Sequence, residues 1–181
     1  MRTPILLSSI LLAGALLLGP SGCKPRIQGG KKAQPASEQT SGLMSVVSAG
    51  DPAASRQLIK GFHGIEQNAW RWTMQRFSVA LRPPMNASEK GAVLVLRFAL
   101  PESSLKSLKS VTVAASVDGT ALSPESYGKA GANVYSREVP AQLLNKDSVA
   151  VDFALDKAIP PGSADQRELG IVVNTVGFEA K

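Results

Sequence analysis

The chain has 181 residues, is 44% hydrophobic and only 5% aromatic, and carries 20 basic and 14 acidic residues, a formal net charge of +6. Residues 56–181 contain 15 of the basic and 12 of the acidic residues, so their net charge is only +3. Because these Lys and Arg residues are spread along the sequence, the chain lacks the basic patch of a nucleic-acid-binding protein, and we expect no nucleic acid among its partners.

Residues 1–22 have the pattern of a secretory signal peptide. Arg2 is the only charged residue before Lys24, and residues 5–18 form a nearly continuous apolar run. A run of this length is too short to cross a hydrocarbon core, which takes roughly 20 residues. The segment therefore predicts export rather than a membrane-spanning helix.

The apolar run is followed by GPSGC at residues 19–23, which resembles the lipobox of bacterial lipoproteins. In that group a small residue precedes a cysteine that is diacylated and becomes the mature N-terminus; Pro20 departs from the group's pattern, in which Leu is favoured. Cys23 is the only cysteine of the chain, so it cannot form an internal disulfide. The resemblance implies that Cys23 anchors the protein to a membrane of the bacterial cell envelope, on the periplasmic side or at the cell surface. The alternative is cleavage by the ordinary signal peptidase, which leaves Cys23 free or removes it.

Residues 24–55 are dominated by Gly, Pro, Ser, Ala and Gln and show the period of neither a strand nor a helix. This composition predicts a disordered tether, and Cys23 with residues 24–55 forms the predicted linker to the domain. The first ten tether residues carry four basic side chains and no acid: Lys24, Arg26, Lys31 and Lys32. This run either contacts anionic lipid headgroups beside the anchor or belongs to a merely soluble linker. The folded domain is expected to cover residues 56–181, which is enough chain for one core.

Eight segments of this domain are rich in β-branched, aromatic and aliphatic residues, and Pro, Gly and Asn separate them. Asp118-Gly119 predicts a hairpin turn, because both residues adopt positive φ angles readily. Only residues 103–109 and 141–145 suit a helical turn. The predicted strands are residues 58–62, 70–73, 77–81, 92–100, 111–117, 133–139, 149–155 and 169–178.

This spacing of about eight or nine short strands, with almost no helix, predicts an all-β sandwich. The long connections fit a jelly-roll or Greek-key sandwich better than an up-and-down barrel. The sequence contains no internal repeats.

Patterns for catalysis or metal binding are missing from the sequence. His63 has no second His and no Cys in the domain with which to share a metal ion. No glycine-rich phosphate loop precedes a helix, and no Ser stands in a nucleophile elbow. Glu66 and Glu168 are candidates for an acid/base pair, although nothing in their spacing requires one. We therefore expect a non-enzymatic protein without a metal or other cofactor.

The two tryptophans stand close together in WRWT, residues 70–73. In a strand, Trp70 and Trp72 face one way and Arg71 the other. If the tryptophans point inward, both indoles belong to the core, where large aromatic side chains are mostly found. If they point outward, two indoles in line form a flat apolar surface suited to the C–H faces of sugar rings. In an intermediate arrangement, one indole is buried and the other lies at a rim.

A second polar block, residues 165–171 (DQRELGI), enters the last predicted strand. Asp165, Arg167 and Glu168 form a solvated turn, a contact for sugar hydroxyls, or a structural clasp in which Arg71 pairs with Asp165 or Glu168. Such a pair ties together segments about 95 residues apart. Because it is partly buried, its net contribution to stability is expected to be close to zero.

Together, GFHG at residues 61–64, Glu66, WRWT and DQRELGI resemble a jelly-roll domain of exported or envelope-associated bacterial proteins. In that group the domain occurs alone or beside glycosyltransferase and polysaccharide-handling modules, and its shape is similar to that of carbohydrate-binding modules. The resemblance covers roughly residues 58–178.

The resemblance implies an exported, lipid-anchored and non-catalytic module that binds a glycan or another polymer of the cell envelope. The alternative is a structural or assembly lipoprotein that holds an envelope protein through the sandwich face or an edge strand. The candidate residues for ligand binding or for a structural clasp are His63, Glu66, Trp70, Arg71, Trp72, Asp165, Arg167 and Glu168.

Overall fold

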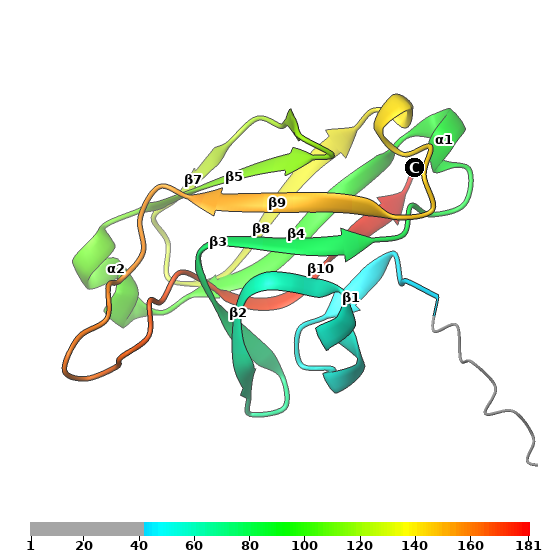
Figure 1. Ribbon diagram of the computed structural model, residues 1–181. Coiled ribbons are helices and arrows are strands. Elements are labelled where there is room, and N and C mark those ends of the chain that lie inside the picture. The colour runs from blue at the N-terminus through cyan, green and yellow to red at the C-terminus, as the bar shows by residue number, and fades with distance from the viewer. Residues whose placement is uncertain (1–41) are drawn as a thin grey trace, which may run out of the picture. The chain divides into compact units, whose positions relative to one another are not determined.

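Antiparallel β-strands dominate the computed structural model, which describes residues 42–181 (Figure 1). The strands are β1 (Val46–Ser48), β2 (Leu58–Glu66), β3 (Trp70–Leu81), β4 (Ala92–Leu100), β5 (Val111–Val117), β6 (Thr120–Ala121), β7 (Glu125–Tyr127), β8 (Gly131–Val139), β9 (Val149–Leu155) and β10 (Val172–Ala180). The connections hold the short helices η1 (Pro52–Arg56), α1 (Ala87–Lys90), α2 (Glu102–Leu108) and η2 (Ala141–Leu143). The predictions of a signal peptide, a lipid anchor at Cys23 and a tether up to residue 41 lie outside the described residues.

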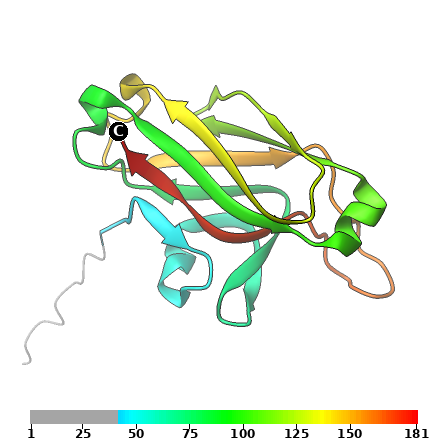
Figure 2. The same cartoon turned by 180° about the vertical axis from the view of Figure 1, so that it is seen from behind.

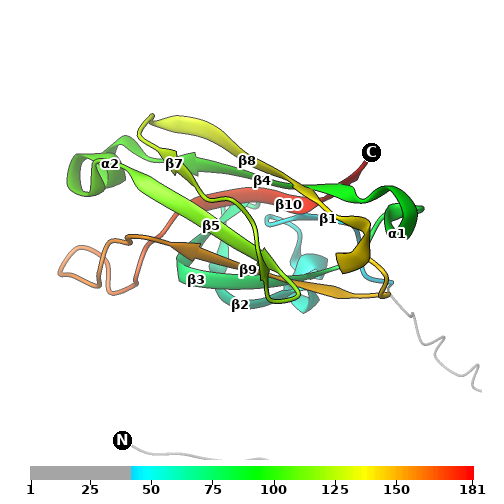
Figure 3. The ribbon, with the colours of Figure 1, turned by 90° about the horizontal axis from the view of Figure 1, so that it is seen from above.

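The strands form one curled sheet with the order β6-β5-β9-β3-β10-β4-β8, while β1, β2 and β7 pair with β10, β3 and β5. Viewed from above, the curl places β4, β8 and β10 over β3, β5 and β9 as two layers (Figure 3). The layer of β4, β8 and β10, in green, yellow and red, lies in front in Figure 2. The prediction of an all-β sandwich is confirmed, with ten strands in residues 42–181.

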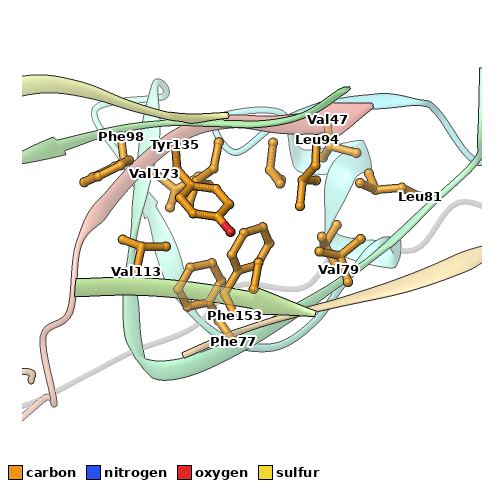
Figure 4. Packing of buried hydrophobic residues seen from close by; sticks show 14 of the residues in the cluster. Val47, Phe77, Val79, Leu81, Leu94, Phe98, Val113, Tyr135, Phe153 and Val173 are labelled. Atoms are coloured by element: carbon orange, nitrogen blue, oxygen red, sulfur yellow. The ribbon is translucent and has the colours of Figure 1, made fainter. Parts of the chain in front are cut away.

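The core lies between the two layers. In β5 and β9 every second residue is buried, which is the pattern of a strand with one face on a core. Phe77 of β3 stacks on Phe153 of β9 with ring centroids 4.9 Å apart, and Tyr135 of β8 approaches Phe153 edge-on at 6.5 Å (Figure 4). Tyr135 therefore joins the layers, and its hydroxyl donates a hydrogen bond to the carbonyl oxygen of Ser123 at 3.0 Å.

Strand β3 lies where the sheet curls from one layer into the other, and this single strand covers the two predicted strands 70–73 and 77–81. Its first part pairs with β10 and its last part with β9. Between these parts, the backbone N–H of Gln75 donates to the carboxylate of Glu168 at 2.5 Å, and the Gln75 side chain donates to the carbonyl oxygen of Leu155 at 3.1 Å. Side chains thus replace ladder hydrogen bonds at the bend of β3 between its two partner strands (Figure 1).

The folded part begins earlier than predicted, because residues 42–55 belong to it and not to the tether. β1 pairs with β10, and Val47 is fully buried. The side-chain amide of Gln57 accepts a hydrogen bond from the N–H of Met44 at 2.9 Å and donates to the Met44 carbonyl oxygen at 3.0 Å, as a backbone partner would. The domain boundary at residue 56 is therefore wrong. A three-residue strand surrounded by Gly, Ala and Ser leaves no periodic pattern, so only its partners reveal it.

Patterns that depend on neighbouring residues predict the local structure well. Asp118 and Gly119, with φ angles of 48° and 83°, form the predicted turn between β5 and β6. Helices α2 and η2 occupy the two segments that suit helical turns. Strands β6 and β7 and helix α1 were not predicted, because two to four residues are too few for a period. No helix within residues 42–181 has the length and apolar character needed to cross a membrane.

Candidate functional site

Trp70 and Trp72 lie on one side of β3, where the strand begins. Both indoles are partly exposed, whereas Arg71 and Thr73 are buried on the other side. The indole centroids are 6.4 Å apart and the ring planes meet at 82°, an edge-to-face arrangement. The pair therefore forms an apolar corner, neither fully buried in the core nor flat as the outward-facing alternative predicted.

Glu66, the last residue of β2, lies directly opposite Trp70 in the β2–β3 hairpin. Gln67 and Asn68 close this hairpin in the left-handed conformation, with φ angles of 51° and 53°. Directly opposed residues of antiparallel strands share one face of the sheet, with Cβ atoms about 5 Å apart. The Glu66 carboxylate therefore lies beside the tryptophan pair.

Arg167, from the connection between β9 and β10, holds two carboxylates. Its Nη1 donates to Glu66 Oε1 at 2.7 Å, while its Nε and Nη2 donate to the two carboxylate oxygens of Asp165 at 3.0 and 2.8 Å. The exposed fractions of the three side chains are 38% for Arg167, 32% for Glu66 and 33% for Asp165. These residues, which we name the Arg167 cluster, thus present fixed charges that solvent and ligands reach.

The Arg167 cluster keeps Asp165 ionised. Hydrogen bonds from the side chain and the backbone N–H of Arg167 lower the pKa of Asp165 to about 2, and nearby His63 adds a smaller effect in the same direction. The hydrogen bonds to Asp165 and then Glu66 raise the pKa of Arg167. Asp165 is therefore a hydrogen-bond acceptor throughout the physiological pH range.

His63 and Glu168 link the β9–β10 connection to strands β2 and β3. Nε2 of His63 lies 2.7 Å from the carbonyl oxygen of Glu168, and the Glu168 carboxylate accepts the hydrogen bond from Gln75 at the bend of β3. The two members of the candidate acid/base pair, Glu66 and Glu168, thus have different partners. Within the described part of the chain, no three His, Cys, Asp or Glu side chains are grouped so that they could hold a metal ion.

The predicted ion pair between Arg71 and Asp165 or Glu168 is wrong. Arg71 is only 9% exposed and points to the face opposite the tryptophans. Its Nε donates to the carbonyl oxygen of Ala49 at 2.9 Å, its Nη1 to that of His63 at 3.1 Å and its Nη2 to the hydroxyl of Ser55 at 2.9 Å. The buried face of β3 meets residues 49–55, which the sequence assigned to the tether, so the partners of Arg71 could not be foreseen.

An open groove of about 490 Å³ lies on the outer face of β5, β9 and β3, and we name it the outer groove. Its floor consists of two rows of cross-strand neighbours, Ala114–Ala154–Arg76 and Ser116–Asp152–Ser78, and Lys60 of β2 also lines it. None of these residues was a candidate from the sequence. The alternation in residues 149–155 was the available signal, because it places Asp152 and Ala154 on the side opposite the apolar residues.

The tryptophan pair and the outer groove lie along the same side of β3. The odd-numbered residues Arg71, Thr73, Phe77, Val79 and Leu81 are buried on its inner side, while Ser78 is buried on the other side, where its hydroxyl donates to Asp152. Side chains alternate along a strand, so the even-numbered Trp70, Trp72, Arg76 and Ser78 share the outer side. At about 3.3 Å per residue, Trp72 and Ser78 are separated by up to roughly 20 Å. Only an extended ligand can contact both places.

No protein-family model matches the sequence, and no curated protein matches it. The fold is similar to part of a cycloisomaltooligosaccharide glucanotransferase of Paenibacillus sp. complexed with cycloisomaltoheptaose, with a TM-score of 0.40 and 11% identity over 76% of this chain. It is also similar to two structures of the CBM51-2 and INT domains of Clostridium perfringens ZmpB, each with a TM-score of 0.37. The structure in complex with GlcNAc is 13% identical over 76% of this chain, and the structure without GlcNAc is 12% identical over 77%. This chain spans 18% of the first structure and 28% of each of the others, and these likenesses concern the fold alone.

Proposed function

We propose that this protein is an exported, lipid-anchored and non-catalytic module that binds a glycan or another hydroxyl-rich polymer of the cell envelope. One observation carries the proposal: two partly exposed indoles lie beside the solvent-accessible Arg167 cluster. A sugar ring has an apolar C–H face and a rim of hydroxyl groups. A site for it needs an aromatic surface next to hydrogen-bonding groups in fixed positions.

The geometry suits both parts of such a ligand. The apolar corner of Trp70 and Trp72 takes the C–H face of a ring, since indoles offer a large apolar area with little conformational freedom to lose. The carboxylates of Glu66 and Asp165 accept hydrogen bonds from hydroxyl groups, and charge-assisted hydrogen bonds are the stronger kind. Because Arg167 already holds both carboxylates, binding costs little further ordering.

Substituting the tryptophans tests the site. We expect at least one of Trp70→Ala and Trp72→Ala to weaken binding to a glycan selected on an array by about tenfold or more, the loss of roughly 1.4 kcal/mol. The matched control is Met85→Ala, because Met85 is an exposed apolar residue, 90% exposed, in the connection between β3 and α1 and away from the tryptophan pair. Titration calorimetry measures affinity and thermal unfolding measures stability. The site is disproved if both tryptophan variants stay folded and bind as tightly as the wild type.

The lipid anchor has a separate test at Cys23. We expect Cys23→Ser to move the protein from the membrane fraction to the soluble exported fraction, because the acyl chains have no other attachment point in a chain with one cysteine. Fractionation with a high-salt wash, followed by immunoblotting, measures this. If the variant still sediments with membranes after the wash, Cys23 is not the anchor.

A second candidate function is an assembly lipoprotein that binds a protein partner. It is favoured by β8, which ends the strand order and carries an exposed apolar residue, Val134, at 44% exposure. A partner in extended conformation adds to such an edge by backbone hydrogen bonds. Binding would then be lost in Val134→Lys and kept in Trp70→Ala, the reverse of the result expected for a glycan.

A further inference from the structure

The outer groove contains a cation with no carboxylate partner. Asp152 has two polar neighbours there, since the Ser78 hydroxyl donates to it and Lys60 Nζ lies 3.8 Å from its Oδ1. Arg76 lines the same groove and makes no ion pair with any residue in the range 42–181. A ligand in the groove therefore meets one guanidinium whose hydrogen-bonding capacity is unused.

The floor of the outer groove leaves room for a ligand. Ala114 and Ala154 lie side by side between β5 and β9, and Ser116 lies next to Asp152. Alanine is depleted in strands, where β-branched and aromatic residues are favoured. Small side chains on the outer face allow a ligand to approach the backbone, while Ser116 supplies a hydroxyl group at its level.

We propose that the outer groove binds a carboxylate of an extended acidic glycan, with Arg76 as the group that receives it. This inference rests on the proposed function and deepens it, because the groove and the tryptophan pair share the outer side of β3. A guanidinium matches a carboxylate with two parallel hydrogen bonds, whereas a neutral sugar offers no such partner. The ligand is thus a linear chain that bears uronic acids, long enough to reach from the apolar corner to Arg76.

The test compares acidic oligosaccharides with their neutral methyl esters. The probes are oligogalacturonate, alginate oligomers and hyaluronate fragments, each titrated into the full-length protein together with its ester. We expect at least one acidic probe to bind, its ester to bind about tenfold more weakly, and Arg76→Gln to lower the affinity for the acid to that for the ester. Added salt should weaken the binding of the acidic probe and leave the binding of its neutral ester unchanged.

Arg97→Gln is the matched control, because Arg97 lies on β4 outside the groove and pairs with Glu179 at 3.1 Å. It should bind the acidic probe like the wild type. The inference is overturned if acid and ester bind equally, if Arg76→Gln has no effect, or if only neutral glycans bind. If a glycan still binds in these cases and its binding depends on Trp70 or Trp72, the proposed function is retained. If neither the probes nor any glycan on an array binds, the proposed function fails as well.

Discussion

Gly61→Ala is expected to lower the free energy of unfolding by about 3 kcal/mol or more. Gly61 has a φ of +76°, which costs a residue with a Cβ atom roughly 1–2 kcal/mol. The added Cβ would lie 2.1 Å from the carbonyl oxygen of Arg76 and 2.7 Å from the Cα atom of Phe77. Both atoms belong to the backbone of β3 at its bend, and Phe77 is at the centre of the core. Displacing either atom would therefore disrupt the packing of the core and destabilise the fold.

The matched control for this substitution is Gly64→Ala, in the same four-residue motif. No atom lies within 4 Å of a Cβ built on Gly64, and its φ is not positive. We expect Gly64→Ala to change the free energy of unfolding by no more than about 0.5 kcal/mol. Urea unfolding of the two variants measures the difference. Equal midpoints would show that the bend of β3 does not require a glycine at position 61.

Arg71→Ala should reduce the free energy of unfolding by about 3 kcal/mol, which for a domain of this size lowers the melting temperature by roughly 10 °C. The guanidinium is buried and joins three parts of the chain through the carbonyl oxygens of Ala49 and His63 and the hydroxyl of Ser55. Without Arg71 these acceptors lose their partner, and an unsatisfied buried group costs about 1–3 kcal/mol. The loss also removes the hydrogen bonds that tie Ala49 and Ser55 to β3.

Arg97→Ala serves as the comparison, because it removes an arginine from an exposed ion pair with Glu179. Such pairs contribute about 1 kcal/mol or less. Thermal unfolding followed by circular dichroism compares both variants with the wild type, and limited proteolysis reports on residues 42–57. If Arg71→Ala unfolds at the same temperature as Arg97→Ala, the hydrogen bonds of Arg71 do not hold the N-terminal segment to the domain.

Local sequence patterns predicted the strands that are rich in β-branched and aliphatic residues. Residues 92–100, 111–117 and 149–155 are strands β4, β5 and β9 with the predicted bounds. Side-chain alternation and the turn residues at the strand ends carry this information, and both act over a few neighbouring residues. By contrast, β1 is a strand only because β10 offers it an edge, and the bend in β3 depends on Glu168, 93 residues away from Gln75.

In the candidate site, too, some features follow from local sequence patterns and others depend on residues far apart in the chain. The residue pattern was sufficient to predict an all-β sandwich, and it singled out two polar blocks that the fold brings together at Glu66, His63 and Arg167. Which arginine meets the acids was decided by the tertiary structure. Arg71 and Arg167 are equally charged, but the alternation of β3 turns Arg71 toward the N-terminal segment, while the β9–β10 connection places Arg167 over Glu66. The outer groove also belongs to the tertiary structure, because β5, β9 and β3 are far apart in the sequence and become neighbours only when they pair in the sheet.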